Sequence, residues 1–273
     1  MYSPPLYYDA HCHWQDERLT ALGFAPGTAV PGCAKAVVNG TRPEDWGRVL
    51  AWAQADQRVI PALGCHPWYA AEWSDASATQ LAEAVKAHGC LIGEIGLDRW
   101  RSPRDENAQE AAFRAQWQLA VDCRRPPSVH CLQASGWLLG VLKESPPQPS
   151  GFLMHAFGGS WETVKTLLDQ GAYFSFSGYF MHERKAAQRT VFQRLPADRL
   201  LVETDAPHMA PPADPALQLP TLPDGTVMNH PANLGWIYQQ LADIRRMPLK
   251  TLANQVESNF IRLFIANHDF TDC

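Results

Sequence analysis

Eight short apolar segments, separated by stretches with helical periodicity, are the feature that most restricts the fold of this chain. They occupy residues 6–8, 35–39, 59–64, 90–96, 127–130, 151–155, 172–178 and 199–205. From one segment end to the next they recur every 21 to 36 residues, the length that a strand, a helix and two short loops require. Eight such units predict an α/β fold, a (β/α)₈ TIM barrel.

Between these segments, apolar residues recur at spacings of three and four. The clearest helix is predicted over residues 105–124, and others are predicted over 43–55, 77–88, 135–144, 160–170 and 182–194. After the eighth segment, the proline-rich stretch 206–225 predicts a long loop over the barrel mouth. Two amphipathic helices, over 231–247 and 249–264, are expected to complete the outer ring.

The length of 273 residues suits one barrel of about 250 residues as well as two domains. No linker, internal repeat or low-complexity tract divides the chain, so we expect a single domain over residues 1–273. An open doubly wound sheet is the alternative. It is disfavoured because no G-x-G-x-x-G follows the first strand.

Composition limits the partners. With 46% hydrophobic and 19% charged residues the chain is globular, and a net charge of −5 leaves no overall positive field for nucleic acid, which would have to be bound locally. No apolar run approaches the roughly 18 residues of a membrane span, and the first residues do not resemble a secretion signal. The seven cysteines include no C-x-x-C pair, which argues against a disulfide framework or a zinc ribbon. We expect a cytoplasmic protein with no membrane partner and no obligate protein partner.

Side chains that can bind metal fall at the carboxyl ends of the predicted strands, where barrel enzymes build their active sites. Six of the eight strands carry one: His11 and His13 on the first, His66 after the third, Glu94 on the fourth, His130 on the fifth, His155 on the sixth, and Glu203 and Asp205 on the eighth. Chance alone would scatter them.

His11 and His13 are two residues apart on an extended segment, so both side chains point to the same side. Such a pair can hold one metal ion. The alternative is a pair of surface histidines. It is less favoured because Asp9 would lie on the same face of the strand and the surrounding pattern is that of a barrel.

Glu203 and Asp205 also share one face of their strand. Two like charges on an inward face cost several kcal/mol unless a cation or protons compensate, and this cost indicates a metal ion. Asp205, nearer the mouth, is the better ligand and general base. Glu203, deeper in the barrel, is expected to lie behind the ligands.

Glu94 interrupts an otherwise apolar strand and needs partners. An arginine inside the barrel is one alternative. A carboxylate bridging two cations about 3.5 to 4 Å apart is the other, and it gives Glu94 a catalytic role. His130 and His155 taken singly would be core histidines, but their shared register at adjacent strand ends favours ligands.

Two further segments are candidates for substrate binding. Gly158 and Gly159 permit a tight turn before Ser160, where backbone N–H groups could bind an anion, although an ordinary capped helix start explains them equally well. The loop that follows Glu94 at the mouth could contact phosphate and stack on a base, or be merely solvated; its residues are Arg99, Trp100, Arg101 and Arg104.

Taken together, these residues resemble the TatD family of metal-dependent deoxyribonucleases, within the amidohydrolase superfamily. The motifs that carry the resemblance are Asp9-Ala-His11-Cys-His13, Gly64-Cys-His66-Pro67, Gly93-Glu94-Ile-Gly96-Leu-Asp98, His130, His155-Ala-Phe-Gly-Gly-Ser160 and Glu203-Thr-Asp205-Ala-Pro207. The resemblance implies a TIM barrel with two divalent ions, one held by His11, His13 and Asp205, the other by His130 and His155, with Glu94 shared. It also implies that His66 faces the substrate.

The chain departs from the family at three places. Leu132 stands where the family usually carries an arginine, two residues after the fifth-strand histidine. His155 is followed by Ala-Phe-Gly-Gly rather than Cys-Phe-Ser-Gly, and Met228-Asn-His230-Pro replaces Arg-Asn-Glu-Pro. Two arginines and a glutamate are thus missing, while every expected ligand is present.

These observations predict a metal-dependent hydrolase that uses two divalent ions, Zn²⁺, Mg²⁺ or Mn²⁺. Such a pair lowers the pKa of a water molecule, and Asp205 can accept its proton. The first hypothesis is a nuclease that cleaves phosphodiester bonds at DNA ends. The second is an amide, ester or lactone hydrolase of small molecules on the same site. A catalytically silent binding module is disfavoured, because no ligand position is lost.

Overall fold

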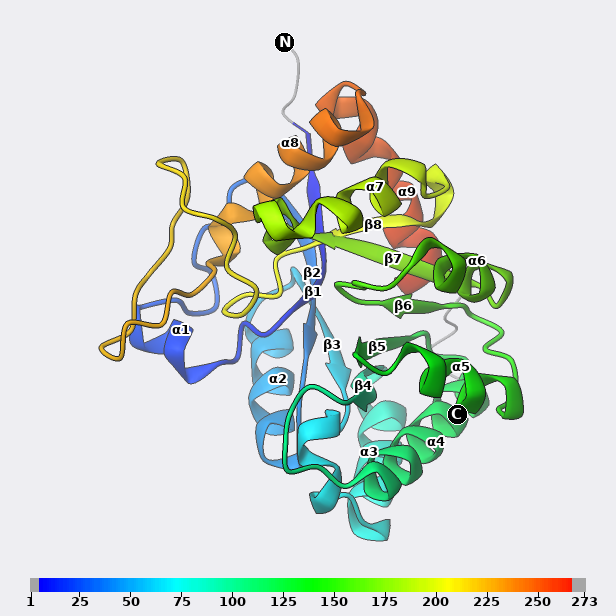
Figure 1. The fold of residues 1–273 in the computed structure, drawn as a ribbon. Coiled ribbons are helices and arrows are strands. Elements are labelled where there is room, and N and C mark those ends of the chain that lie inside the picture. The colour runs from blue at the N-terminus through cyan, green and yellow to red at the C-terminus, as the bar shows by residue number, and fades with distance from the viewer. Residues whose placement is uncertain (1–4, 267–273) are drawn as a thin grey trace.

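The computed structural model describes residues 5–266 and contains one sheet of eight parallel strands (Figure 1). The strands follow one another around the sheet in chain order: β1 (Tyr7–Cys12), β2 (Cys33–Asn39), β3 (Val59–Leu63), β4 (Leu91–Asp98), β5 (Pro127–Leu132), β6 (Phe152–Met154), β7 (Ala172–Ser177) and β8 (Leu200–Glu203). Each lies within a few residues of a predicted strand.

The sheet closes on itself at the carboxyl ends of its first and last strands. The backbone N–H of Asp205 donates to the carbonyl of His11 at 2.9 Å, and the N–H of His13 donates to the carbonyl of Ala206 at 2.9 Å. The structure therefore confirms the TIM barrel, and the open doubly wound sheet is excluded.

Helices surround the barrel in the predicted places. They are α2 (Pro43–Ala55), α3 (Asp75–His88), α4 (Glu106–Asp122), α5 (Ser135–Glu144), α6 (Trp161–Asp169), α7 (Ala186–Arg194), α8 (Leu234–Arg245) and α9 (Leu249–Phe264). The 182–194 prediction begins too early, since α7 starts at Ala186 after a 3₁₀ turn, Glu183–Lys185. The short helix α1 (Glu17–Ala21) was not predicted, because five residues are too few to show a period.

Capping residues explain where the helices begin. The side chain of Asp105 accepts a hydrogen bond from the N–H of Ala108 and starts α4, whose buried face includes Phe113 and Trp117. The side chain of Ser160 accepts from the N–H of Thr163 and starts α6. Each cap satisfies a backbone donor that the first turn leaves without a partner.

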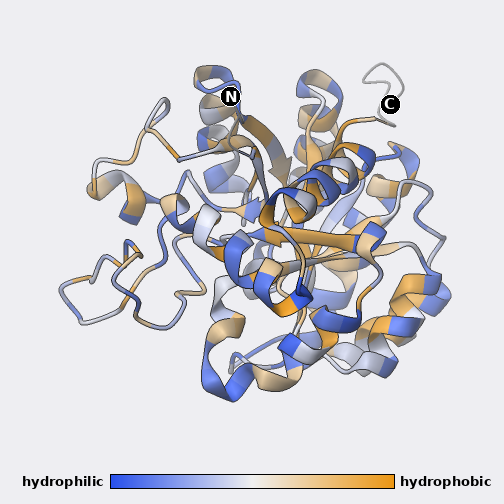
Figure 2. Ribbon diagram, turned by 90° about the horizontal axis from the view of Figure 1, so that it is seen from above, coloured by the Kyte–Doolittle hydropathy of each residue, from blue (hydrophilic) through white to orange (hydrophobic). Residues whose placement is uncertain are grey.

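Apolar side chains of the strands fill the barrel and the layer between barrel and helices. Val38, Ile92, Phe174 and Val202 are all buried, and Figure 2 shows the apolar strands surrounded by helices with polar outer faces. None of the helices between residues 5 and 266 has the length and apolarity needed to cross a membrane.

The proline-rich segment forms a long loop without helix or strand until the 3₁₀ turn Pro231–Asn233. Both ends of the loop are attached to the mouth. The side-chain amide of Asn229 donates to the carbonyl of Thr204 at 2.7 Å, and the N–H of Asn229 donates to the carbonyl of Pro207 at 3.0 Å. Figure 1 shows the rest of the loop, in yellow, extending beside α1.

Candidate metal centre

Six side chains from five strand ends converge inside the barrel mouth. His11 and Glu94 lie on β1 and β4, and His130 lies on β5. His13, His155 and Asp205 stand one or two residues beyond the ends of β1, β6 and β8. All are buried except His130, which is partly exposed.

The first half of this cluster joins two imidazoles and two carboxylates. The Nε2 atom of His11 lies 3.3 Å from Oε2 of Glu94 and 3.7 Å from Oδ1 of Asp205. Nε2 of His13 lies 3.5 Å and 3.3 Å from the same two oxygens. The nitrogens and Oδ1 lie within 4.8 Å of one another and could hold a metal ion.

The second half faces the other oxygen of Glu94. Its Oε1 atom lies 3.0 Å from Nδ1 of His130 and 2.9 Å from Nε2 of His155. The two imidazole nitrogens are 3.3 Å apart. The one carboxylate of Glu94 thus presents a different oxygen to each histidine pair.

The remaining ring nitrogens of the first pair are fixed by the protein. Nδ1 of His13 lies 2.8 Å from the carbonyl oxygen of Asn39, which can only accept, so Nδ1 carries the proton and Nε2 presents a lone pair to the cluster. Nδ1 of His11 lies 2.7 Å from the hydroxyl of Ser128. This arrangement is typical of metal-ligating histidines.

The carboxylates of the cluster are ionised. Burial raises the pKa of Glu94, but its contacts with the surrounding imidazoles outweigh this effect and hold the pKa well below its usual range. Burial likewise opposes the ionisation of Asp205, while its contact with His13 and the charge of His155 hold its pKa below the usual range. Ionised carboxylates are the form that binds metal.

At His11 and Glu203, burial shifts the pKa, and the neighbouring groups offset this shift only in part. Burial lowers the pKa of His11 to about 4, so the imidazole is neutral at neutral pH, as a ligand must be. Burial raises the pKa of Glu203 to about 6. Its Oε2 atom accepts from the hydroxyl of Ser175, and its Oε1 atom lies 3.5 Å from Nδ1 of His155, on the side of the ring away from Glu94.

One buried oxygen tests whether the cluster fits a metal ion. Oδ1 of Asp205 accepts no hydrogen bond from any residue between 5 and 266, although it is enclosed by the barrel and charged. A buried ionised oxygen without a donor is costly unless a cation lies beside it. The donor set of imidazole nitrogens and carboxylate oxygens therefore fits divalent metal ions.

His66 lies beside the second half but differs from the other histidines. Its Nδ1 atom accepts a hydrogen bond from the N–H of Trp68 at 3.1 Å, so in the neutral ring Nε2 carries the proton. That nitrogen lies 3.5 Å from Oε1 of Glu94. Its position allows a metal ligand, but the protonated nitrogen suits a hydrogen-bond donor, which agrees with the expectation that His66 faces substrate.

Asp98 had no role in the predictions from sequence, although an even spacing of four residues on β4 places it on the same face of the strand as Glu94. Its Oδ2 atom lies 2.9 Å from Nε2 of His130 and accepts from the indole N–H of Trp68 at 3.0 Å. These contacts lower the pKa of Asp98 to about 2 against the effect of its burial. A carboxylate behind a histidine orients the ring and makes its other nitrogen a better ligand.

His208 and Arg18 were also missed. The His208 ring lies edge to face with that of His13, their centroids 5.3 Å apart, and Nη2 of Arg18 lies 2.7 Å from its Nε2 atom. Arg18 belongs to the unpredicted helix α1 and forms an ion pair with Asp16 at 2.6 Å. This cation therefore lies at the rim of the first half of the cluster.

Of the residues predicted to bind substrate, Arg99 and Trp100 lie in the loop after β4. Arg99 is held by Glu106, at 3.1 and 2.8 Å, whereas the Trp100 ring is 59% exposed. Gly158 and Gly159 line a separate cleft of about 580 Å³ between α6 and α7. The residues that line this cleft include none of the six of the metal cluster.

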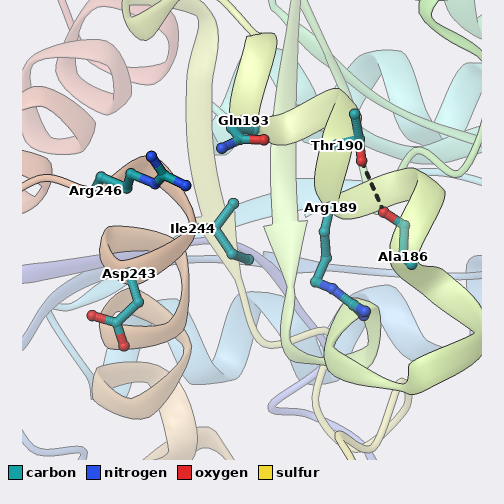
Figure 3. A pocket seen from close by; sticks show the side chains of 7 residues that line it. All are labelled: Ala186, Arg189, Thr190, Gln193, Asp243, Ile244 and Arg246. Carbon is teal, nitrogen blue, oxygen red and sulfur yellow. Dashed lines mark hydrogen bonds between the residues drawn. The ribbon is translucent and has the colours of Figure 1, made fainter.

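A smaller cavity lies between α7 and α8, outside the barrel (Figure 3). Its volume is about 310 Å³, and Arg189, Asp243 and Arg246 supply its charges. Arg189 already donates to the carbonyls of Phe180 and His182. This cavity shares no lining residue with the metal cluster.

The family described as TatD related DNase matches residues 8–265. The chain belongs to the TatD family. The 3'-5' ssDNA/RNA exonuclease TatD of Pantoea ananatis (strain LMG 20103) is 34% identical over 236 residues, covering 85% of this chain and 88% of the relative. The protein of that name from Enterobacter lignolyticus (strain SCF1) is 31% identical over 235 residues, with the same coverage of 85% and 88%.

A solved structure supports the same relationship. The crystal structure of YJJV, a TatD homologue from Escherichia coli K12, matches with a TM-score of 0.85 and 27% identity, covering 95% of this chain and 98% of that one. TatD membership implies a hydrolase that uses divalent metal, and the cluster of His, Glu and Asp side chains agrees with it.

The two positions where TatD proteins usually carry arginine differ in their surroundings. Leu132 ends β5 with an exposed side chain, and its carbonyl accepts from the N–H of Arg99 at 2.9 Å. Met228 is buried in the loop after β8. Neither position therefore supplies a cation to the mouth.

Proposed function

We propose that this TatD protein is an exonuclease that hydrolyses phosphodiester bonds at the ends of single-stranded DNA or RNA with two divalent metal ions. The observation that carries the proposal is the position of Glu94. One of its oxygens faces His11 and His13, and the other faces His130 and His155. Two adjoining half-sites that share a carboxylate are the arrangement of two-metal hydrolases.

We assign the ligands from these two half-sites. His11, His13 and Asp205 would hold one ion, His130 and His155 the other, and Glu94 both. The imidazole-rich set suits Zn²⁺, and Mg²⁺ or Mn²⁺ would be held more weakly. When bound, the two ions supply a water of lowered pKa and polarise the phosphate.

The protein supplies the proton transfers. Asp205 is ionised, so a carboxylate oxygen that does not hold an ion can accept the proton of the attacking water. His66 presents an N–H beside Glu94, where it can donate to an oxygen of the scissile phosphate. Glu203 lies behind His155 and fixes the direction of its ring.

The substrate assignment rests on the relatives, which are named as exonucleases of single-stranded DNA and RNA. One observation favours the small-molecule alternative: Leu132 and Met228 place apolar side chains where the family usually has cations. An amide, ester or lactone hydrolase would not need those cations.

A nuclease assay separates the two functions. Protein loaded with Zn²⁺, Mn²⁺ or Mg²⁺ is incubated with 5′-labelled single-stranded and blunt duplex oligonucleotides, and the products are resolved by length. We expect a ladder that shortens one nucleotide at a time on the single strands, with Asp205→Asn as the inactive control. Hydrolysis of small esters or lactones with every oligonucleotide left intact would replace the nuclease by the alternative.

A further inference from the structure

Two exposed tryptophans and an arginine form one surface at the barrel mouth, which we call the aromatic platform: Trp68, Trp100 and Arg101. The two indole rings lie 6.1 Å apart and are tilted by 30°. The guanidinium of Arg101 lies 4.9 Å from the centre of the Trp68 ring. Trp68 is 39% exposed and Trp100 59% exposed, which is unusual for such large apolar side chains.

The platform is attached to the second half of the metal cluster through Asp98. One oxygen of Asp98 accepts from the indole N–H of Trp68 at 3.0 Å and lies 2.9 Å from Nε2 of His130. The other accepts from the backbone N–H groups of Trp100 and Arg101, at 2.7 and 3.0 Å. The same carboxylate therefore fixes the platform and a candidate metal ligand.

His66 spans the distance between platform and cluster. Its ring lies edge to face with that of Trp68, their centroids 4.9 Å apart. Its Nε2 atom lies 3.5 Å from Oε1 of Glu94. A substrate whose scissile phosphate lies at Glu94 has Trp68 within reach of the neighbouring group.

The charges of the loop after β4 are not equivalent. Arg99 and Arg104 both bind the carboxylate of Glu106. Arg101 forms no ion pair with any described residue, and it is exposed. It is therefore the guanidinium of this loop that is available to an anion from solution.

From this geometry we infer that the platform binds the nucleobase next to the scissile phosphate, with Arg101 on an adjacent backbone phosphate. Stacking on an aromatic ring needs an unpaired base and accepts any base, which is the chemistry of binding a single-stranded nucleic-acid end. This inference rests on the proposed exonuclease function. It adds Trp68 to the loop residues Trp100 and Arg101 that the sequence already indicated, and it leaves out Arg99, which is held by Glu106.

The test compares two substrates in each variant. One is a single-stranded oligonucleotide, and the other is identical except for an abasic residue at the end that is cleaved. In the wild-type protein, loss of the base should lower kcat/KM by about 5- to 150-fold, which corresponds to the range of stacking energies per base. In Trp68→Ala and Trp100→Ala, the normal substrate should lose a similar factor, while the abasic substrate is cleaved as by the wild type.

Trp68→Phe separates stacking from the hydrogen bond to Asp98. It keeps an aromatic ring and loses the indole N–H, so it should retain most of the preference for the substrate with a base. Ile261→Ala, which truncates an exposed side chain on α9, is the matched control and should behave as the wild type.

Arg101→Ala tests the phosphate contact. Each phosphate contact on a single strand contributes a slope of about 0.7 to the fall of log affinity with log salt concentration, and this variant should lose one such contribution. Arg104→Ala, whose guanidinium is already bound to Glu106, is the control and should keep the slope.

Two outcomes overturn the inference. In one, the tryptophan variants slow the normal and the abasic substrates equally, which shows a structural effect through Asp98. In the other, the wild type does not distinguish the two substrates. If the wild type cleaves no oligonucleotide at all, the proposed exonuclease function fails. If it cleaves oligonucleotides but gives either of the two outcomes above, only the role of the platform fails.

Discussion

At the scale of single residues, the site depends on which atom of each side chain is free. His13 has its Nδ1 proton directed at a backbone carbonyl, so that Nε2 faces Glu94 and Asp205. His66 has the opposite assignment, because its Nδ1 atom accepts from a backbone N–H. Histidines of one cluster are thus divided into candidate ligands and a candidate donor by their backbone contacts, which residue type and spacing do not reveal.

Asp205→Asn should abolish most activity while leaving the fold intact. An amide cannot accept the proton of the attacking water and is a weaker ligand, so kcat should fall by at least about 100-fold. Initial rates on a single-stranded oligonucleotide and circular dichroism measure the two effects. Asp198→Asn, an exposed aspartate paired with Arg199, is the control. Wild-type turnover by Asp205→Asn would move the role of base to Glu94.

Asp98→Asn should weaken metal binding without removing a ligand. The carboxylate that orients His130 is replaced by an amide, and loss of such a partner lowers metal affinity by about 10- to 100-fold. Calorimetric titration with Zn²⁺ or Mn²⁺ measures the affinity. Glu106→Gln alters a neighbouring carboxylate that binds Arg99 and Arg104, and should leave the metal affinity unchanged. Equal affinities in Asp98→Asn and the wild type would reduce Asp98 to a structural role.

At the scale of elements, glycines allow β4 to bring Glu94 close to its neighbours. A Cβ atom on Gly96 would lie 2.1 Å from the carbonyl oxygen of His130, and one on Gly93 would lie 2.6 Å from Oδ1 of Asn39. Both approaches are closer than any side chain permits. The glycines that flank Glu94 are therefore required by the packing of β4 against β2 and β5.

Gly96→Ala should destabilise the barrel, because the added methyl group meets backbone that cannot move without separating β4 from β5. We expect the free energy of unfolding to fall by more than about 2 kcal/mol, the range of overpacked sites. Gly140→Ala on α5, where nothing lies within 4 Å, should instead stabilise by up to about 1 kcal/mol. Urea unfolding measures both, and a neutral Gly96→Ala would contradict the close packing.

An ion pair in the short connection from α2 to β3 should make the stability of the protein depend on pH. Asp56 accepts from the guanidinium of Arg58, at 3.0 and 2.6 Å, and from the N–H of Gly27, and these contacts hold its pKa below the usual range. The stabilisation is fully present above about pH 4, the pKa of the Asp56 carboxyl in the unfolded chain. It is lost as the pH falls below that value.

Asp56→Asn should therefore cost about 1 to 3 kcal/mol at pH 7, since the contacts involve charged groups. The difference from the wild type should stay constant down to about pH 5 and shrink below pH 4. Urea unfolding at several pH values measures it. A difference that does not change with pH would contradict the ionised pair.

At the scale of the whole molecule, the sequence was sufficient for the barrel and for the residues gathered at its mouth. Strands and helices repeat with enough regularity to be counted, and the carboxyl ends of parallel strands must meet at one end of a barrel. Helix α1 was not predicted, and of the aromatic platform the sequence indicated Trp100 and Arg101 but not Trp68. Trp68 follows β3 whereas Trp100 follows β4, and only the folded chain brings the two rings together.

The positions of bound metal ions would show whether two ions share Glu94. Crystals of the wild-type protein are soaked in Mn²⁺, and anomalous difference maps locate the ions. We predict two peaks on either side of Glu94, one beside His11, His13 and Asp205 and one beside His130 and His155. A single peak, or peaks away from Glu94, would contradict a shared carboxylate between two metal ions.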